Sequence, residues 1–357
     1  MSSNERRLFD PEGLNTATWP EISGNPITPV DHFFTRSHAP APAIDPATWR
    51  LEVGGLVQQP RTFSLRELQD TFPQRTVTAT LVCAGLRREE LLAARPIPGE
   101  LPWGLEPAST GSWSGIALAD VLAAVGIAEG ARHVEFIGLD EVERHGHHFG
   151  FGASIDLAKA QGPEVLLATH LNGAPLPVPH GFPLRAVVPG WIGARSVKWL
   201  GRINLTAQPS ENYFQTQAYR FLREPNPQDP RDVTAGTALT TIILNALIAH
   251  PKANQVLPAG PVQVQGWAIG TEGQPLKSIE LSHDNGQTWQ QPQVVAEGGP
   301  WAWTFWQANL NLNPGRHILV VRATDSGGAS QPRDVAETWN AKGYANNAWH
   351  RVEVVVE

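Results

Sequence analysis

A proline-rich segment beyond the middle of the chain most constrains how this sequence can fold. Residues 223–236, REPNPQDPRDVTAG, contain three prolines among mixed charges. Because proline fixes its own backbone angle and has no amide donor, this stretch suits neither a helix nor a strand and is typical of a linker. We therefore predict an N-terminal tail over residues 1–30, a first domain over 31–223, a linker over 224–236 and a second domain over 237–357.

The second domain is predicted to be all-β. Gly, Pro, Asn and Asp separate short apolar, β-branched runs at Thr241–Ile248, Val262–Ile269, Ser278–Ser282, Trp301–Trp306, His317–Ala323 and Val352–Val356. The sequence Asp284-Asn285-Gly286 is typical of a β-hairpin turn. Six strands within about 120 residues predict an immunoglobulin-like sandwich. Seven of the 13 tryptophans follow residue 260, which indicates dense aromatic packing or an interface.

The first domain is predicted to mix helices and strands. Helical patterns cover Ser64–Phe72, which opens with a serine cap, Ala117–Val125 and Ile155–Ala160. Strand patterns cover Trp49–Gly54, Thr76–Val82, His133–Gly138, Leu184–Val188 and Ser196–Leu200. The fold class predicted for the whole chain is therefore α+β, with a mixed α/β domain followed by an immunoglobulin-like sandwich.

Composition argues against several kinds of partner. Lys and Arg number 27 against 34 Asp and Glu, so at a net charge of −7 the chain has no basic excess for nucleic acid. No apolar run approaches the roughly 18 residues of a membrane-spanning helix, so we expect no membrane partner. Residues 6–9, RRLF, resemble the core of an export signal, but Asp10 and Pro11 follow instead of an apolar stretch. We expect a cytoplasmic protein, or a periplasmic one if a leader has been removed.

The chain has one cysteine, Cys83, which excludes intrachain disulfides and multi-cysteine metal sites. Every second residue from Val77 to Cys83 is apolar, so this thiol ends a strand face. Arg87 and Arg88 follow after a turn, and nearby cations favour the thiolate, the form that binds metals and reacts. The alternative is a small buried hydrophobe at a strand end.

Other cations of the first domain lie next to glycines. Arg36 belongs to FFTRSH, and Arg185, Arg195 and Lys198 lie in or beside VPGWIGARSVKW (188–199). Guanidinium binds oxyanions and phosphates through a rigid fork, and glycine lets a phosphate approach the backbone. The pattern favours an oxyanion or a phosphorylated cofactor beside a thiolate. The alternative is a set of surface cations paired with acidic neighbours.

Histidines provide further candidates. His145, His147 and His148 could bind a metal, although a loop cluster of this kind is more often solvated. His180, in HGFPLR, either contacts a ligand or satisfies its turn. The chain has no C-x-x-C-H, Walker loop, H-E-x-x-H or G-x-G-x-x-G, so covalent haem and the usual nucleotide and zinc-protease sites lack support.

Six segments occur in order along the chain. They are FFTRSH (33–38), TATLVCAGLRR (78–88), ASTGSWSGIAL (108–118), FGASIDLAKA (151–160), EVLLATHLNGAPLPVPHGFPLRAVVPGWIGARSVKWLGRI (164–203) and a tail containing GQTW, WAW, WN and NAWHRVEV. Together they resemble the sulfite oxidase family of molybdenum enzymes. The resemblance runs from Phe33 to Val356 and spans both predicted domains.

The resemblance implies a molybdopterin cofactor and a role for each matching position. Cys83, in C-A-G-x-R-R, becomes the sole protein ligand of a molybdenum otherwise held by the pterin's dithiolene, and a soft thiolate suits such a centre. The implied substrate-anion positions are Arg36, Arg88 and Trp103. The implied pterin contacts are Phe33, Phe34, His38, Asp140, His180, Arg185, Ser196, Val197 and Lys198.

The activity implied by the resemblance is oxidation of sulfite to sulfate by oxygen-atom transfer at a molybdenum–oxo centre. The second domain resembles the family's dimerisation domain, which implies a homodimer. The haem domain of some relatives is missing from this sequence, so we expect no haem and a separate electron acceptor, such as a cytochrome or oxygen. Two alternatives stay open: a molybdopterin reductase of nitrate or a sulfoxide, and a non-catalytic two-domain binding protein.

Phe151, a fourth catalytic candidate, departs from the family's pattern, in which tyrosine is usual at this position. The three tyrosines of this chain are Tyr213, Tyr219 and Tyr344. Because phenylalanine neither donates a hydrogen bond nor relays a proton, the expected hydroxyl is missing at Phe151. We therefore expect Phe151→Tyr to raise sulfite turnover, and the departure keeps the alternative substrates open.

Overall fold

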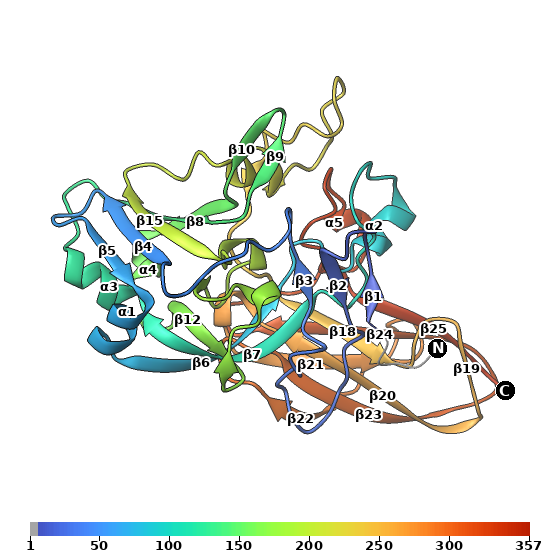
Figure 1. The fold of residues 1–357 in the computed structure, drawn as a ribbon. Helices are drawn as coiled ribbons and strands as arrows, with labels where there is room; N and C mark the ends of the chain where they lie inside the picture. The colour runs from blue at the N-terminus through green and yellow to red at the C-terminus, as the bar shows by residue number, and fades with distance from the viewer. Residues whose placement is uncertain (1–5) are drawn as a thin grey trace.

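The computed structural model describes residues 6–357, which form a mixed α/β body and a β-sandwich (Figure 1). The sandwich contains the C-terminal strands, shown in orange and red, and the mixed body lies above and to its left. This arrangement confirms the predicted fold class. Among the described residues, no helix is long and apolar enough to cross a membrane.

Two β-sheets enclose the core of the mixed body. Their strands are β4 (Arg50–Gly55), β5 (Arg61–Ser64), β6 (Gln74–Val82), β7 (Ala108–Ala117), β8 (His133–Gly138), β11 (Gly152–Asp156), β12 (Leu166–Leu171), β13 (Ala174–Pro175), β14 (Arg185–Val187) and β15 (Leu200–Thr206). One sheet has the order β11-β8-β15-β4-β5, and the other has the order β13-β12-β7-β6 with β14 paired to β12. Leu51, Phe136 and Ile203 of the first sheet pack against Ile116 and Leu167 of the second.

Short helices and single helical turns occur in both bodies. They are α1 (Leu65–Thr71), α2 (Arg88–Ala94), α3 (Leu118–Val125), α4 (Leu157–Ala160), α5 (Val335–Thr338), the 3-10 turns η1 (Val178–His180), η2 (Gly193–Arg195) and η4 (Thr271–Gly273), and the π-turn η3 (Phe214–Ala218). The predicted serine cap of α1 is confirmed, because Ser64 and Glu67 form a reciprocal capping box. Leu118, Val121, Leu122 and Val125 form the buried face of α3.

The sandwich consists of two four-stranded sheets. Its strands are β18 (Asn245–His250), β19 (Gln255–Leu257), β20 (Gly260–Ile269), β21 (Leu276–Ser282), β22 (Gln293–Glu297), β23 (Thr304–Leu312), β24 (Gly315–Asp325) and β25 (His350–Val356). The sheet orders are β18-β20-β23-β22 and β19-β25-β24-β21. Each predicted run overlaps a strand. The sequence pattern missed β19 and β22, edge strands with no fully buried residue.

The N-terminal segment differs from the tail that the sequence predicts. Its strands β1 (Arg7–Leu8) and β2 (Asn15–Ala17) form a three-stranded sheet with β3 (Thr35–Arg36), and all of β2 is buried. Arg6 fastens this sheet, because its Nε donates to Thr16 Oγ1 at 2.7 Å and its Nη2 donates to Phe33 O at 3.2 Å. The segment is therefore an integral part of the mixed body.

The predicted strand Ser196–Leu200 is wrong over most of its length. Only Leu200 is in a strand, at the start of β15, and residues 196–199 form an irregular loop. Trp199 has a left-handed backbone with φ of 49°, which no strand permits. The loop is fastened by the Ser196 hydroxyl, which accepts a hydrogen bond from the Val188 amide, and by Arg185, which donates to the Ser196 carbonyl.

Two small hairpins complete the fold. β9 (Val142–Arg144) pairs with β10 (His147–Phe149), and β16 (Arg220–Phe221) pairs with β17 (Thr237–Ala238). The chain between β16 and β17, residues 222–236, contains turns and bends but no helix or strand.

The strand that ends at Cys83 lies where the two bodies meet. Leu81 and Cys83 pack in a cluster with residues of the mixed body, whereas the neighbouring Val82 packs against the sandwich. The Thr80 amide donates to Trp301 O, and the Trp303 amide donates to Thr80 Oγ1, each at 2.9 Å. The end of β6 is thus buried on both faces and held by hydrogen bonds to Trp301 and Trp303.

Candidate active site

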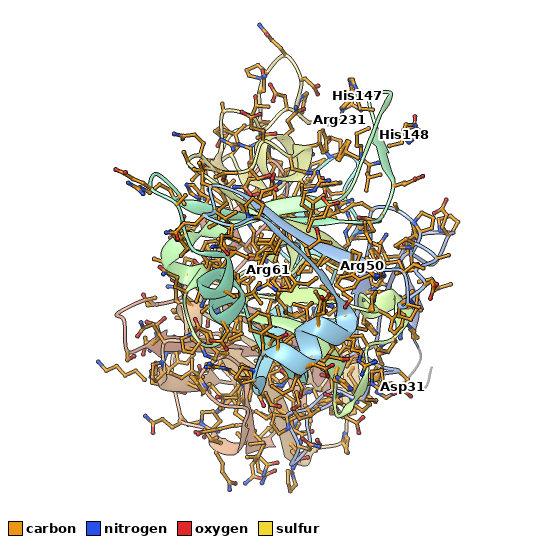
Figure 2. All side chains as sticks on the ribbon, turned by 60° about the vertical axis from the view of Figure 1, so that its left-hand side comes forward. Asp31, Arg50, Arg61, His147, His148 and Arg231 are labelled. Carbon is orange, nitrogen blue, oxygen red and sulfur yellow. The ribbon has the colours of Figure 1, made fainter. Side chains whose placement is uncertain are left out.

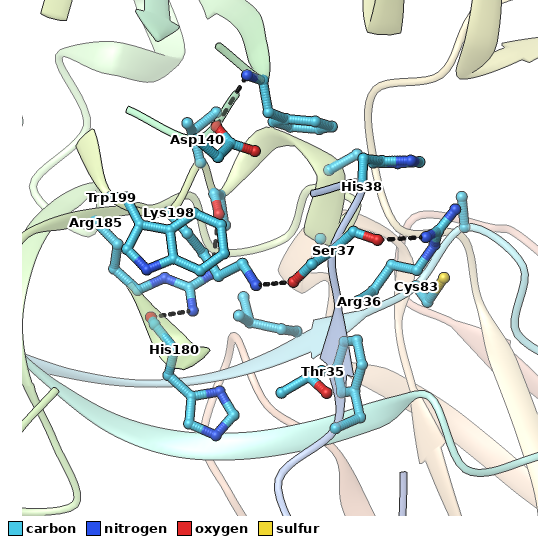
Figure 3. Close-up of a pocket in the computed structure, with 18 of the residues that line it drawn as sticks. Thr35, Arg36, Ser37, His38, Cys83, Asp140, His180, Arg185, Lys198 and Trp199 are labelled. Atoms are coloured by element: carbon cyan, nitrogen blue, oxygen red, sulfur yellow. Dashed lines mark hydrogen bonds between the residues drawn. The ribbon is translucent and has the colours of Figure 1, made fainter. Parts of the chain in front are cut away.

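The end of β6 opens into a cavity (Figure 3). The cavity brings together Cys83, Arg36, Phe151 and every position that the resemblance gives to the pterin: Phe33, Phe34, His38, Asp140, His180, Arg185, Ser196, Val197 and Lys198. These residues come from β3, the end of β6, the turns after β8 and before β11, η1, β14 and the loop before β15. Segments far apart in the sequence therefore meet at one hollow.

Cys83 is 7% exposed. Its amide donates to Pro107 O at 2.9 Å, and its carbonyl accepts from the Leu86 amide at 3.0 Å. Gly193 comes close from the opposite loop, where a β-carbon would lie 3.2 Å from Val82 O. Glycine suits this position because a side chain would press against the backbone leading to the thiol.

Arg36 lies at the same end of the cavity as Cys83 (Figure 3). Its Nη1 donates to Asn15 Oδ1 and to Ser37 O, both at 2.8 Å. Among residues 6–357, its Nε and Nη2 have no hydrogen-bond partner. Burial opposes the charge of Arg36, but nearby Tyr219, Cys83 and other groups outweigh it and raise the pKa. A permanent cation with two open donors therefore faces the cavity beside the thiol.

Lys198, Arg185 and His180 line the other end of the cavity (Figure 3). Lys198 Nζ donates to Ser37 Oγ at 2.6 Å and to Pro179 O at 3.0 Å, and burial with Arg185 nearby lowers its pKa to about 7. Burial and the same guanidinium lower the pKa of His180 to about 3, so its imidazole is neutral. An anion at this end would restore the full charge of Lys198.

Arg185 lines the cavity and also links buried backbone segments through hydrogen bonds. Its three nitrogens donate to the carbonyls of Ala186, His180 and Ser196 at 3.3, 2.9 and 2.9 Å. Burial lowers its pKa to about 9, which still leaves the group charged at neutral pH. Arg185 therefore fixes the two loops that present His180 and Ser196, and it adds positive potential to the cavity.

Aromatic side chains form one wall of the cavity, beside Arg36. The His38 ring stacks on Phe151 at 5.5 Å and lies 4.2 Å from the Phe214 ring. Its Nε2 shares a hydrogen bond of 2.9 Å with the hydroxyl of Tyr219. Burial and the cations Arg36, Arg144 and Lys198 push the pKa of His38 well below its usual value, so the ring is neutral.

Asp140 holds the backbone of this wall. Its Oδ1 accepts from the Phe151 amide at 3.0 Å, and it is 3% exposed. Burial raises the pKa of this carboxyl, although the amide bond to Phe151 and the charge of Lys198 oppose the shift. Among residues 6–357, Asp140 is the one carboxylate that lines the cavity.

Tyr219 is the functional residue that sequence reasoning missed. It lines the cavity, is 5% exposed, and has a pKa raised to about 12, chiefly by burial. The hydroxyl that is absent at Phe151 is therefore supplied by another tyrosine of the same hollow. No local motif marks Tyr219, because it meets His38 across 181 positions of the chain.

The sandwich also reaches this site. Tyr344 stacks on Tyr219 with ring centres 5.6 Å apart, and the Ala345 amide donates to Ala84 O at 2.8 Å. The loop that carries these two residues thus braces the cysteine turn and the tyrosine wall. Sequence reasoning gave the second domain only a role in association, because nothing in its pattern points to the cavity.

Two of the implied substrate positions, Arg88 and Trp103, do not line the cavity. Arg88 is 3% exposed and its nitrogens bind the carbonyls of Lys342, Gly343 and Leu101 and the carboxylate of Glu100. Trp103 is fully buried against Phe9, with ring centres 3.9 Å apart. Their roles toward the substrate stay predictions of the resemblance.

The histidine cluster lies away from the cavity. His145, His147 and His148 are exposed on the β9–β10 hairpin, where the latter two project from the outer edge of the molecule (Figure 2). Within residues 6–357, no group of three or more His, Cys, Asp and Glu side chains is arranged to hold a metal. The solvated alternative describes these histidines better than a metal site does.

The residues of the cavity fit the cofactor that the resemblance implies. A buried thiol supplies one soft ligand at one end, and Lys198 with Arg185 supplies positive charge at the other end, where a phosphate would lie. Between these two ends of the cavity, the neutral His180 and the hydroxyl and amide groups of the 196–198 loop can form hydrogen bonds with such a cofactor. When such a cofactor is bound, Cys83 would hold the metal and Lys198 the anionic tail.

Comparison with known proteins assigns both bodies. Residues 38–214 match the family model described as the oxidoreductase molybdopterin binding domain, and residues 237–357 match the Mo-co oxidoreductase dimerisation domain. The sulfane dehydrogenase SoxCD of Paracoccus pantotrophus has a similar fold, with a TM-score of 0.80 over 97% of this chain and 87% of that chain, at 24% identity.

Sequence relatives extend the match over the full chain. Sulfite oxidase of Gallus gallus is 38% identical over 91% of this chain and 72% of its own length. The mitochondrial sulfite oxidase of Homo sapiens is 39% identical over 100% of this chain, which spans 66% of the human protein. These matches, with both domain models in the expected order, show that the chain belongs to the sulfite oxidase family of molybdopterin oxidoreductases.

Proposed function

We propose that this protein oxidises sulfite to sulfate in the cavity shared by Cys83 and Arg36 and passes the electrons to a separate acceptor. The observation that supports this most is the guanidinium of Arg36, which lines the same end of the cavity as the thiol and has two nitrogens without a hydrogen-bond partner among residues 6–357. Relatives named sulfite oxidase over most of this chain point to the same substrate.

The chain's own contribution to this reaction is to bind and orient a small dianion. When bound, the molybdopterin supplies the oxygen-atom transfer and takes up the electrons. Arg36 offsets the charge of the anion and points two donors at its oxygens, which fixes its direction of approach. Tyr219, kept protonated by its raised pKa, adds a neutral donor or acceptor beside Arg36. The walls of His38 and Phe151 narrow the access of water.

The direct test is molybdenum and pterin content of the purified protein, measured together with sulfite-dependent reduction of ferricyanide. We expect close to one molybdenum per chain and turnover with sulfite. A loaded protein that ignores sulfite but reduces nitrate or methionine sulfoxide would establish the alternative reductase instead. A protein without molybdenum from a host that makes the cofactor would contradict the proposal.

Arg36→Met is expected to raise the KM for sulfite by roughly tenfold to a hundredfold, which corresponds to the loss of one charged hydrogen-bonded contact. The comparison variant is Arg88→Met, because Arg88 is buried close by but spends its donors on carbonyls and Glu100. We expect Arg88→Met to lower the Tm more than it changes KM. A larger increase in KM for Arg88→Met than for Arg36→Met would place the anion beside Arg88 instead of Arg36.

The lowered pKa of Lys198 predicts a pH-dependent anion effect. In the unfolded chain its pKa is near 10.5, and in the folded protein it is about 7, so the unfolded state holds more protons between these values. This group therefore makes stability rise with pH from about 7 to 10.5 in the absence of an anion. Below pH 7 the charged amine is present for an anion to neutralise.

We expect sulfate to raise the Tm of cofactor-free protein more at pH 6 than at pH 8. Sulfate keeps its charge between pH 6 and pH 8. The pKa of His180 is about 3 and the pKa of His38 is well below its usual value, so both imidazoles stay neutral. The difference in Tm between the two pH values therefore reports the charge of Lys198. Thermal unfolding of the wild type and of Lys198→Gln checks this. An equal pH dependence in both proteins would remove Lys198 from the anion end.

A homodimer formed through residues 237–357 is a further expectation, which rests on the match to the dimerisation domain. Light scattering at micromolar concentration should give a mass of twice 38.8 kDa. A mass of one chain would contradict it. The acceptor is proposed to be a small oxidant or a cytochrome, and assays with oxygen and with cytochrome c would separate these two.

A further inference from the structure

The N-terminal strand β2 contacts Arg36, at the thiol end of the cavity, through Asn15. Asn15 is 5% exposed and lies directly across from Arg36 in the antiparallel pair of β2 and β3. Its side-chain oxygen accepts from Arg36 Nη1 at 2.8 Å and from the Ser37 amide at 3.3 Å. One amide oxygen thus holds both the guanidinium and the backbone that follows it.

This contact sets the direction of the whole guanidinium. The group is planar, so two acceptors on Nη1, Asn15 Oδ1 and Ser37 O, fix its rotation as well as its position. The remaining nitrogens, Nε and Nη2, have no hydrogen-bond partner among residues 6–357 and stay available to an anion in the cavity that Arg36 lines. Without Asn15 the long side chain would regain rotamer freedom, and ordering it would cost part of the binding free energy of the anion.

The chemistry of the acceptor matters as much as its place. The amide oxygen of Asn15 is neutral, so it orients Arg36 without cancelling its charge. A carboxylate at 3 Å would orient the group equally well, but it would offset the positive charge that attracts a dianion.

We propose that Asn15 is a positioning residue for the substrate anion, which holds Arg36 so that its open edge faces the thiol end of the cavity. This inference rests on the proposed function of that cavity as an oxyanion site. It also gives the N-terminal strands a role in the reaction, since Thr16 and Arg6 hold β2 against β3 through the Thr16–Thr35 and Arg6–Thr16 hydrogen bonds.

The test is a double-mutant cycle on the cofactor-loaded protein. Asn15→Ala is expected to raise the KM for sulfite about tenfold and to leave kcat within about twofold. In an Arg36→Met background the same substitution is expected to change KM less than twofold, because its partner is already gone. Equal fold-changes in the two backgrounds, or an unchanged KM in the single variant, would overturn the proposal.

Asn15→Asp separates orientation from simple structural support. It keeps the acceptor oxygen, so a purely structural role predicts a normal KM, whereas the proposal predicts a KM at least as high as that of Asn15→Ala with no fall in Tm. Asn25→Ala is the matched control, because Asn25 is exposed on the same N-terminal segment and bonds only within its own turn. It should leave KM and Tm unchanged.

Sulfate binding to the loaded protein, measured by calorimetry, keeps this test independent of turnover. We expect the dissociation constant for sulfate to rise about tenfold in Asn15→Ala and to stay the same in Asn25→Ala. This result would support Asn15 even if sulfite proved not to be the substrate. Wild-type affinity for sulfate in Asn15→Ala would overturn the role of Asn15 whatever the protein oxidises.

Discussion

Replacing Cys83 by serine is expected to lower sulfite turnover by roughly a hundredfold or more, because loss of a metal ligand should exceed the 10–100-fold cost of losing an outer partner. The thiol is buried at the end of β6 and faces the cavity beside Arg36. Serine keeps nearly the same volume, so the backbone bonds to Pro107 and Leu86 are retained. Its hydroxyl stays protonated at neutral pH, however, and is a poor ligand for a soft metal.

The measurement combines turnover, metal and pterin content and the Tm of the loaded protein. Ala79→Ser is the matched control, since Ala79 is fully buried on the same face of β6 but does not line the cavity. That variant should lose stability and keep its turnover. Wild-type turnover in Cys83→Ser would exclude Cys83 as the metal ligand and return it to the role of a small core residue.

The sequence predicts the strands and helices that have one buried and one exposed face, because their apolar residues recur at regular spacing. The apolar alternation that ends at Cys83 follows from a strand with one face toward the core, and Ala79, Leu81 and Cys83 do share one cluster. The sandwich was predictable because β25 alternates buried and half-exposed residues and the turns contain their usual residue types. Edge strands such as β22 were missed, because a strand with little burial has no such pattern.

Contacts between distant segments were not predictable from the residues alone. Asn15 belongs to a stretch whose composition resembles a tail, and only its pairing with β3 shows that it supports Arg36. The residues from Ser196 to Leu200 have a strand pattern in the sequence. Hydrogen bonds to Arg185 and Val188 hold residues 196–199 as a loop facing the cavity instead. The family resemblance supplied the positions of most lining residues, which no periodicity could give.

Tyr219 shows the same limit in the functional site. From the family's pattern we expect the hydroxyl to be missing at Phe151, whereas the structure places the phenol of Tyr219 on the cavity wall. The two rings lie 6.4 Å apart. Phe151→Tyr is therefore expected to change sulfite turnover little, in contrast to the increase that the sequence predicts, because the hydroxyl is already supplied.

Tyr219→Phe is expected to lower kcat/KM for sulfite by roughly tenfold to a hundredfold, the range for one hydrogen bond to a charged group. The phenol lies among Arg36, His38 and the thiol end of the cavity, and its pKa near 12 keeps it protonated at neutral pH. Neutral His38 and Tyr219 share one hydrogen in their 2.9 Å bond. When the imidazole donates, the phenol hydrogen is free to point at an anion. Phenylalanine retains the stacking on Tyr344 and removes only the hydroxyl.

Tyr213→Phe is the matched control for this loss. Tyr213 and Tyr219 flank the π-turn η3 on its two sides. Tyr213 packs edge-on against Phe214, but it does not line the cavity. It should therefore keep the wild-type kcat/KM. The double variant Tyr219→Phe with Phe151→Tyr decides whether the hydroxyl or its position matters: recovery would mean that a phenol anywhere on this wall suffices. Continued loss would mean that the hydroxyl must lie beside His38 and Arg36, and an unchanged kcat/KM in Tyr219→Phe alone would exclude the phenol from the reaction.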